Sequence, residues 1–271
     1  MAGEHTRDLF EARIEDAIRR SASGSVAHIP FLTMRERRSA ERILDARGMR
    51  GAYWFFGGHT TAERACLFVL PDYLTAILPE EDADREEVLF DYLADELKDT
   101  VVSISIKGSG FRKLTHRDYL GAVLGLGIER DAIGDIAVQN EHQAILFCPR
   151  TLAAFLIGEL NKVGSDTVRC RECVIDETFT DGKQYRPISD TVASPRLDCV
   201  VAALCNLSRE AAQGAIRSGL VEVDFEPEER VDTALEPPIT VSVRGHGRFI
   251  LRSFDGETKK GRLRLRADQL I

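Results

Sequence analysis

The sequence Ser194-Pro195-Arg196-Leu197-Asp198 opens the C-terminal third of this chain, and Ser208-Arg209 and Gly219-Leu220-Val221-Glu222-Val223-Asp224 follow it in that order. This spacing predicts two short helices and a strand, with an arginine at the start of each helix. Ser194 is a suitable N-cap, and Pro195 fits the first helical position. A helix N-terminus presents unpaired backbone N–H groups and a partial positive charge, so an arginine beside it makes a site for phosphate. We therefore expect this segment to contact a nucleic-acid backbone.

Apolar side chains recur at helical spacing in both predicted helices. In the first helix they are Leu197, Val200, Val201 and Leu204, and in the second they are Ala211, Ala212, Ala215 and Ile216. Ser208 can cap the second helix, and Gly219 suits the left-handed position that ends it. Alternating apolar residues then predict strands at 221–225 and 239–243. The segment is thus expected to form a small α+β domain whose helices pack through their apolar faces.

This order of elements resembles the S4 domain, also called the alpha-L RNA-binding motif. The matching positions are Arg196-Leu197-Asp198, Ser208-Arg209, Ala212, Ile216, Gly219 and Val221-Glu222-Val223. Two features depart from the pattern. Asp224 stands where asparagine is usual, and Glu236-Pro237-Pro238 replaces the usual Gly-Asp turn before the last strand. The resemblance implies RNA binding at the surface of this domain, and the extra carboxylate of Asp224 would weaken it.

The candidate RNA-binding residues of this domain are mostly basic. Arginine suits bidentate contact with phosphate oxygens, so we expect phosphate contacts from Arg196, Arg209 and Arg217, with Asp198 orienting an arginine. The run from Lys259 to Arg266 places three arginines on one face of a strand and two leucines on the other. A solvated edge strand remains an alternative. We favour an extension of the phosphate-binding face, because two further arginines come from the neighbouring strand. The full set is Arg196, Asp198, Ser208, Arg209, Arg217, Arg244, Arg248, Lys259, Lys260 and Arg262.

Charge and composition limit how the chain can bind RNA. The 271 residues carry 36 Lys and Arg against 44 Asp and Glu, a formal net charge of −8. From Ser194 to the end we count 12 of each sign, so the excess of negative charge lies upstream. An acidic protein binds RNA through a local patch and not indiscriminately. The cysteines show no disulfide framework, and nothing resembles a signal peptide or membrane span. We therefore expect a cytoplasmic protein without a membrane partner.

The upstream part of the chain alternates helices and strands. The expected helices are 5–20, 33–47, 84–97, 114–126 and 152–163, and the expected strands are 53–56, 65–70, 101–106, 135–138, 144–147 and 167–174. From residue 101 the order is strand, helix, strand, strand, helix, strand, which is that of the ferredoxin-like or RNA-recognition-like fold. We predict an α+β protein with an N-terminal α/β region at 1–62, a ferredoxin-like middle domain at 63–180, a polar linker at 181–193 and the S4 domain at 194–271.

A second motif lies in the middle domain. It reads LTHRDYLGAVLGLGIER from Leu114 to Arg130 and continues as Ile133-Gly134-Asp135-Ile136. Together with the sequence from Val241 to Phe249, it resembles the YlmH family of S4-domain proteins, over about 33–249. The resemblance implies a non-enzymatic factor of the large ribosomal subunit that binds ribosomal RNA or tRNA through the S4 domain during rescue or quality control of stalled translation. His116, Arg117 and Arg130 would then form a middle-domain surface for RNA or ribosomal protein.

The same motif has a purely structural interpretation. Thr115 would cap a helix, and Asp118 would lie in its first turn. His116-Arg117-Asp118 is also the signature of a protein-kinase catalytic loop. The sequence disfavours a kinase, because Val123 occupies the position of the metal-binding asparagine and no glycine-rich nucleotide loop is present.

Other functional classes remain open at this point. Cys170 and Cys173 form a lone pair whose side chains face opposite sides of a predicted strand, so we expect no metal and no cofactor. One alternative is an RNA-modifying enzyme or its accessory. Another is a cell-division or photosystem-assembly factor that acts through protein contacts. The expected oligomeric state is a monomer.

Overall fold

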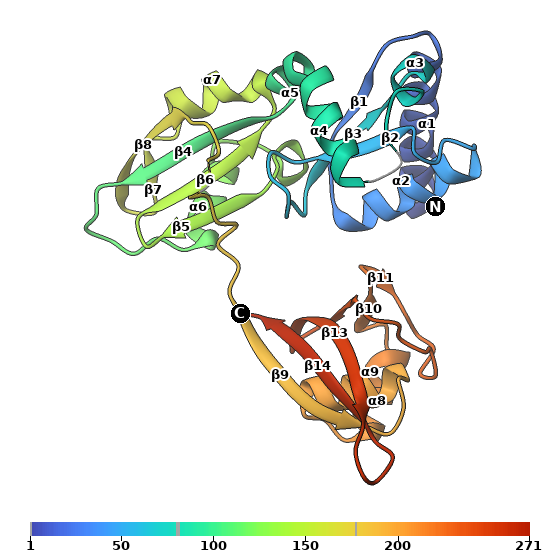
Figure 1. Ribbon diagram of the computed structural model, residues 1–271. Helices are drawn as coiled ribbons and strands as arrows, with labels where there is room; N and C mark the ends of the chain where they lie inside the picture. The colour runs from blue at the N-terminus through green and yellow to red at the C-terminus, as the bar shows by residue number, and fades with distance from the viewer. Residues whose placement is uncertain (1, 80–81, 177) are drawn as a thin grey trace. The chain divides into compact units, whose positions relative to one another are not determined.

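The computed structural model describes residues 2–79, 82–176 and 178–271, and the chain forms two compact units, Met1–Gly182 and Lys183–Ile271 (Figure 1). Each unit packs helices against antiparallel sheets, which gives a mixed architecture of helices and strands. No helix in the described part of the chain is both long and apolar enough to cross a membrane.

The first unit begins with a three-stranded antiparallel sheet in the order β1-β3-β2. Its strands are β1 (Ala27–Leu32), β2 (Tyr53–Phe56) and β3 (Ala65–Val69). Helices α1 (Ala2–Ala22) and α2 (Met34–Ala46) cover one face through a core that includes Ile14, Ile29, Leu44 and Leu67. Three short helices follow, which are α3 (Asp72–Thr75), α4 (Asp82–Tyr92) and α5 (Ala94–Thr100).

The central position of β3 corrects the predicted start of the middle domain at residue 63. β3 pairs with β1 and β2, so it belongs to the N-terminal sheet. All five of its residues are buried because both faces are covered. Leu67 and Val69 face the core under α1 and α2, whereas Cys66 and Phe68 face a second core. A strand buried on both faces shows no alternation, so its sequence does not reveal which sheet it joins.

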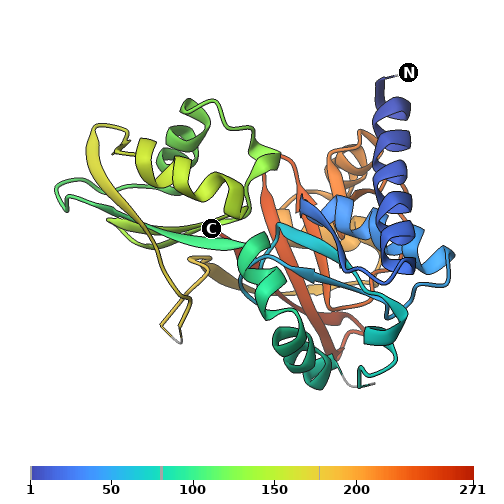
Figure 2. The same ribbon diagram turned by 90° about the horizontal axis from the view of Figure 1, so that it is seen from above.

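The rest of the first unit is a five-stranded antiparallel sheet in the order β5-β6-β4-β8-β7. The strands are β4 (Val102–Gly108), β5 (Ile136–Asn140), β6 (Gln143–Cys148), β7 (Lys162–Val163) and β8 (Asp166–Glu172). Helices α6 (His116–Gly125) and α7 (Arg150–Glu159) lie on one side of this sheet (Figure 2). A 3-10 turn, η1 (Arg130–Ala132), precedes β5. The predicted succession of strand, helix, strand, strand, helix, strand is observed, except that the helix predicted at 152–163 ends at Glu159 and the two-residue strand β7 is added before β8.

The two sheets of this unit share a core. Phe31 and Phe68 from the first sheet pack with Ile145 and Phe147 from the second, and α4 adds Leu89. This core covers part of the sheet face that is opposite α6 and α7. The N-terminal elements are therefore fixed on the second sheet and do not form an independent domain.

The second unit packs two helices on a six-stranded antiparallel sheet in the order β11-β10-β12-β13-β14-β9. The helices are α8 (Leu197–Cys205) and α9 (Arg209–Arg217), and the strands are β9 (Tyr185–Val192), β10 (Val221–Val223), β11 (Glu226–Pro227), β12 (Ile239–Val243), β13 (Gly247–Glu257) and β14 (Leu263–Leu270). The predicted apolar faces of both helices are buried against the sheet, with Val200 and Ile216 beside Val241 and Phe249. Gly219 has the predicted left-handed backbone, with φ of 67°.

Strand β9 replaces the polar linker that we predicted at 181–193. It pairs with β14 along its whole length, from Tyr185↔Leu270 to Val192↔Leu263. The segment looks like a linker because it is an edge strand with one face exposed, so few of its residues are apolar. Pro187 is compatible with an edge strand, where a missing N–H leaves no ladder bond unmade.

A substitution at Gly58 tests how tightly the two sheets of the first unit are packed together, because Gly58 lies against Phe147 of the second sheet. A Cβ at this position would lie 2.2 Å from Phe147 Cδ1, and φ is +95°. We expect Gly58→Ala to lower the free energy of unfolding by roughly 3 kcal/mol, from backbone strain and overpacking together. Urea unfolding followed by the fluorescence of Trp54, the chain's one tryptophan, measures this unit.

Gly24→Ala is the matched control, because Gly24 has a similar φ of +89° but open space at the Cβ position. This variant should lower the free energy of unfolding by only about 1 kcal/mol, which is the backbone strain of alanine at positive φ. Equal losses in both variants would show that Phe147 moves aside freely and that the joint is loose.

Candidate nucleic-acid interface

A buried carboxylate organises the start of the two helices in the second unit. Asp198 lies in the first turn of α8 and is fully buried. Its Oδ1 accepts from Arg196 Nε at 3.1 Å, and its Oδ2 accepts from Arg209 Nε at 3.0 Å. Gln213 Nε2 donates to the same Oδ2 at 2.8 Å. One carboxylate thus connects the entry of α8 to the first two turns of α9.

The electrostatics of Asp198 follow from these donors. Burial alone would raise the pKa of the carboxyl, but hydrogen bonds from Arg196, Gln213 and Arg209 lower it well below the ordinary value. The carboxylate is therefore charged at neutral pH. Two guanidinium groups against one carboxylate leave the cluster with a charge of 2 − 1 = +1.

Both arginines remain accessible while they are anchored. The side chain of Arg196 is 38% exposed and that of Arg209 is 56% exposed, whereas Asp198 is 0% exposed. Arg209 uses only Nε in the contact, so its two terminal nitrogens point away from the carboxylate. Asp198 therefore positions the arginines and does not itself contact RNA, which agrees with the orienting role expected for it.

The start of α8 differs from the prediction. The helix begins at Leu197 with Arg196 as N-cap, so neither Ser194 nor Pro195 has its predicted place. Leu197 N donates to Thr233 O at 2.8 Å, and Asp198 N donates to Val231 O. A loop distant in sequence thus satisfies the backbone N–H groups that we expected to face phosphate. Any phosphate at this point must be bound by side chains.

Helix α9 carries further predicted residues in a row. Ser208 caps it as predicted, with Oγ accepting from Ala211 N at 3.1 Å. Arg209, Gln213 and Arg217 follow at intervals of four, which places them on one face. Arg217 is exposed in the last turn of the helix. This face begins at the Asp198 cluster and ends near the turn between β12 and β13.

That turn supplies the next pair of basic residues. Arg244 N donates to Leu220 O at 2.9 Å, which places the exposed Arg244 beside the end of α9. Arg248 lies over the Phe225 ring, with Cζ 5.1 Å from the ring centroid. An open hollow of about 380 Å³ lies here, lined by residues that include Gly219, Glu222, Ser242, Arg244 and Arg248. Arg209 and Arg217 therefore share one face of α9, with Arg196 at its start and Arg244 at its end. Arg248 lies on the sheet face opposite the helices, because its partner Ser242 alternates with the buried Val241 and Val243.

The remaining predicted residues lie elsewhere. Lys259, Lys260 and Arg262 belong to the turn between β13 and β14, and Arg248 is at the opposite end of β13. The 11 residues of β13 span roughly 35 Å, so these residues do not extend the surface at Arg244 and Arg248 as we expected. Arg262 is instead bound to β9, where its Nε donates to Thr191 Oγ1 at 3.0 Å.

The predicted middle-domain surface is also largely structural. Thr115 and Asp118 form a capping box at the start of α6, as the structural interpretation predicted. Arg130 Nη1 donates to Gly134 O at 3.0 Å, so its guanidinium group is bound to that turn. Partial burial, and then the positive charge of Arg130, lower the pKa of His116, so its ring is neutral at pH 7. Of the three predicted residues, Arg117 alone is an exposed cation without such a role.

A buried cluster at the joint of the two sheets was missed by sequence reasoning. Asp135 accepts from Glu63 N at 2.7 Å and Arg64 N at 3.2 Å, and His59 Nε2 lies 3.5 Å from Oδ2. Arg64 Nε donates to Ile133 O at 2.9 Å. Burial opposes ionisation of Asp135, but these donors lower its pKa below the ordinary value. Local sequence patterns do not reveal this cluster, because His59 and Asp135 lie 76 positions apart in the sequence.

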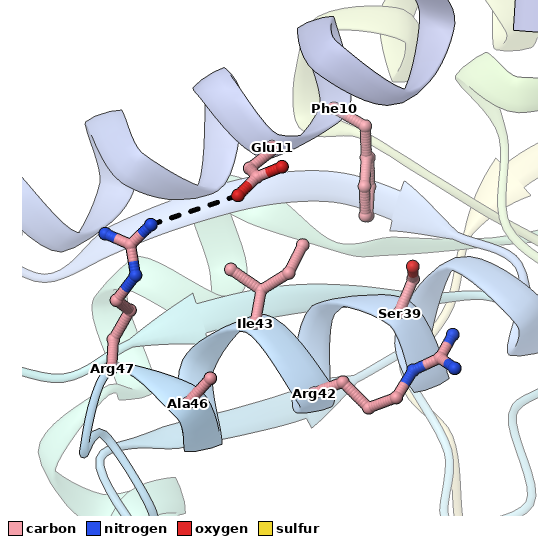
Figure 3. A pocket seen from close by; sticks show the side chains of 7 residues that line it. All are labelled: Phe10, Glu11, Ser39, Arg42, Ile43, Ala46 and Arg47. Atoms are coloured by element: carbon pink, nitrogen blue, oxygen red, sulfur yellow. Dashed lines mark ion pairs between the residues drawn. The ribbon is translucent and has the colours of Figure 1, made fainter. Parts of the chain in front are cut away.

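Two further features of the first unit are the cysteine pair and a hollow between α1 and α2. Cys170 Sγ contacts Leu160 O, whereas Cys173 contacts Ser103 on the other face of the sheet, as predicted. Burial raises the pKa of Cys170 to about 11. No group of three or more potential metal ligands occurs among the described residues. The hollow of about 360 Å³ between α1 and α2 is lined by Phe10, Ile43 and Arg47, among others, and Arg47 pairs with Glu11 at 3.9 Å (Figure 3).

Asp198→Asn tests whether the carboxylate maintains the helix pair. The charged form is stabilised in the folded state, so its contribution is full above the unfolded pKa of about 3.9 and is lost as pH falls below it. We expect Asp198→Asn to lower the free energy of local opening by roughly 2–3 kcal/mol at pH 7, because both arginines lose a charged partner. Amide hydrogen exchange of α8 and α9, measured by mass spectrometry, reports this directly.

The difference in the free energy of local opening between wild type and Asp198→Asn should become smaller as pH is lowered below about 4. Asp190→Asn removes an exposed carboxylate of the same unit and serves as the control. A difference that stays constant from pH 7 to pH 3 would contradict a charged Asp198.

The chain has recognisable relatives. Residues 96–177 match the family described as "Putative RNA-binding domain in YlmH". The chain is 31% identical over 211 residues to the ribosome-associated protein quality control protein P2 of Bacillus subtilis (strain 168), covering 78% of this chain and 75% of that protein. The solved cell division protein ylmH from Streptococcus pneumoniae aligns with a TM-score of 0.43 and 23% identity, over 61% of this chain and 90% of that one. Because the similarity to the Bacillus protein spans most of both sequences, the chain belongs to the YlmH family.

Proposed function

We propose that this chain is a non-enzymatic RNA-binding factor that acts on the large ribosomal subunit during quality control of stalled translation. The observation that carries the proposal is the pair of exposed arginines, Arg196 and Arg209, fixed on one buried carboxylate. The name of the Bacillus relative, ribosome-associated protein quality control protein P2, supports the ribosome as the place of action.

The proposal includes a division of labour within the fold. We assign the second unit to the S4 domain, because α8 begins with the Arg-Leu-Asp sequence of that motif, α9 begins with its Ser-Arg pair, and β10 carries its Val-Glu-Val. We assign the middle part to the ferredoxin-like or RNA-recognition-like fold, which its sheet order of β5-β6-β4-β8 supports. The border between the N-terminal and middle parts then lies close to the start of β4 at Val102. The match of the family model from residue 96 supports this border.

The ligand that fits the second unit is structured RNA, either ribosomal RNA or tRNA. Fixed guanidinium groups bind phosphate oxygens and recognise the shape of a backbone more than its sequence. The net charge of −8 disfavours binding to RNA that does not match the arginine surface. Binding of this kind requires neither a cofactor nor a second copy of the chain, so we propose a monomer.

Arg209→Ala tests the surface without removing the buried carboxylate or Arg196. Titration of purified large ribosomal subunits at several salt concentrations measures both affinity and the number of phosphate contacts. We expect Arg209→Ala to weaken binding by about tenfold and to reduce the slope of log K against log salt by about 0.7–0.9, because one phosphate contact is lost. Arg19→Ala, which removes an exposed arginine of α1, should change neither quantity.

The double variant Arg196→Ala/Arg209→Ala should leave the large-subunit fraction in a sucrose gradient. If wild-type protein stayed at the top of the gradient, the ribosome would be wrong as the place of action. If Arg209→Ala kept the full salt slope, its contact with phosphate would be wrong.

A further inference from the structure

The five-stranded sheet of the first unit has a face that α6 and α7 do not cover. The shared core with the N-terminal elements covers one part of this face, around Ile145 and Phe147. The other part is exposed. It carries four cations, which are Lys107, Lys162, Arg169 and Arg171.

The strand register places these cations together. Lys107 of β4 lies directly opposite Arg169 of β8, and Ser105 lies opposite Arg171. Residues paired in this way share a face, so both arginines are beside Lys107. Lys162 of β7 is opposite Thr167, two positions before Arg169 and on the same face. The same register puts the acidic residues of β8 on the helix side, because Glu172 is opposite Ile104.

This arrangement has an electrostatic cost. Like charges directly opposite each other on a sheet destabilise it. Within the described strands no acidic side chain shares this face, and no ion pair within the described part of the chain neutralises any of the four cations. The chain as a whole carries a net charge of −8, so four unneutralised cations on one small face are a local reversal of sign. Such a face is complementary to a polyanion.

A loop at the same end of the sheet adds an aromatic side chain. Phe111 lies four residues after Lys107 and is 91% exposed. Ser109 N donates to Asp166 Oδ2 at 3.1 Å, and Leu114 N donates to Glu141 O at 2.8 Å, so both ends of the loop are fixed. Arg112 follows Phe111 and is exposed as well. The ring is therefore exposed in a loop that is anchored at both ends, next in sequence to Arg112 and four residues from Lys107, and an unpaired nucleobase can stack on it.

We propose that this face, together with the Phe111 loop, binds single-stranded RNA at a site separate from the arginine surface of the second unit. The four cations bind consecutive phosphates along the sheet. Phe111 stacks on an unpaired base at its end. The site binds a flexible strand, in contrast to the structured RNA proposed for the second unit.

The test uses the full chain and a short fluorescein-labelled oligouridylate, with a blunt RNA duplex of equal length for comparison. Fluorescence anisotropy is measured at several salt concentrations. We expect Arg169→Gln/Arg171→Gln to weaken binding of the single strand by about tenfold and to reduce the salt slope by about 1.4, at about 0.7 for each phosphate contact. Phe111→Ala should weaken it about tenfold with an unchanged slope, because stacking releases no counterions.

Three controls separate this site from other effects. Arg150→Gln removes a cation that pairs with Glu172 at 2.7 Å on the helix side of the sheet, and should leave binding unchanged. The melting temperature of Arg169→Gln should stay equal or rise, because a like-charge pair is relieved. Arg209→Ala should bind oligouridylate as wild type does while its binding to the ribosome is weakened. Loss of binding at one site is then distinguishable from loss of binding at the other.

Three results would overturn the proposal. The first is equal binding by wild type and Arg169→Gln/Arg171→Gln. The second is preference for the duplex over the single strand. The third is loss of oligouridylate binding only in Arg209→Ala. Binding of an acidic polypeptide such as polyglutamate, but not of oligouridylate, would instead assign the face to a protein partner.

Discussion

The second unit depends on one buried charge. Asp198 is removed from water in the first turn of α8, which would be strongly unfavourable without donors. Arg196, Arg209 and Gln213 supply them, and two of these come from the other helix. The carboxylate therefore does more than join α8 to α9. It fixes the spacing of two exposed guanidinium groups, and this spacing is what a bound phosphate backbone would recognise.

A partly buried carboxylate, Asp135, has the matching role in the first unit. Asp135 accepts two backbone amides from the segment before β3, and Arg64 returns a hydrogen bond to the chain just before Asp135. These contacts close the joint between the two sheets, and Phe147 fills the space beside Gly58. The exposed part of the second sheet is defined by this joint, because the N-terminal elements cover the rest of that face. A rigid joint thus determines which cations remain accessible.

The sequence predicted correctly those elements that depend on residues close together in the chain. The capping of α6 and α9, the apolar faces of α8 and α9 and the strand succession from β4 to β8 were all readable from spacing and residue type. The errors have a common cause, which is pairing between residues distant in sequence. β9 resembles a linker in sequence because its partner β14 is more than 70 residues away. The start of α8 is fixed by hydrogen bonds to the carbonyls of Val231 and Thr233, which are also distant in sequence. The sequence of β8 shows Arg169 and Arg171 at alternate positions, and hence on one face. Only the strand register shows that Lys107 of β4 lies beside both of them.

Because the chain is acidic, its binding to RNA depends on where the anchored arginines are placed. A protein with a net charge of −8 is repelled by RNA at long range, so binding must be gained at short range from fixed groups. Arginines that are anchored at one end lose little conformational freedom on binding, which favours them over free lysines at such a surface. The same repulsion makes an incorrect RNA costly, because it meets the negative surface without engaging the anchored cations. Specificity then comes from the geometry of a few guanidinium groups, and this geometry is set by the buried carboxylate of Asp198.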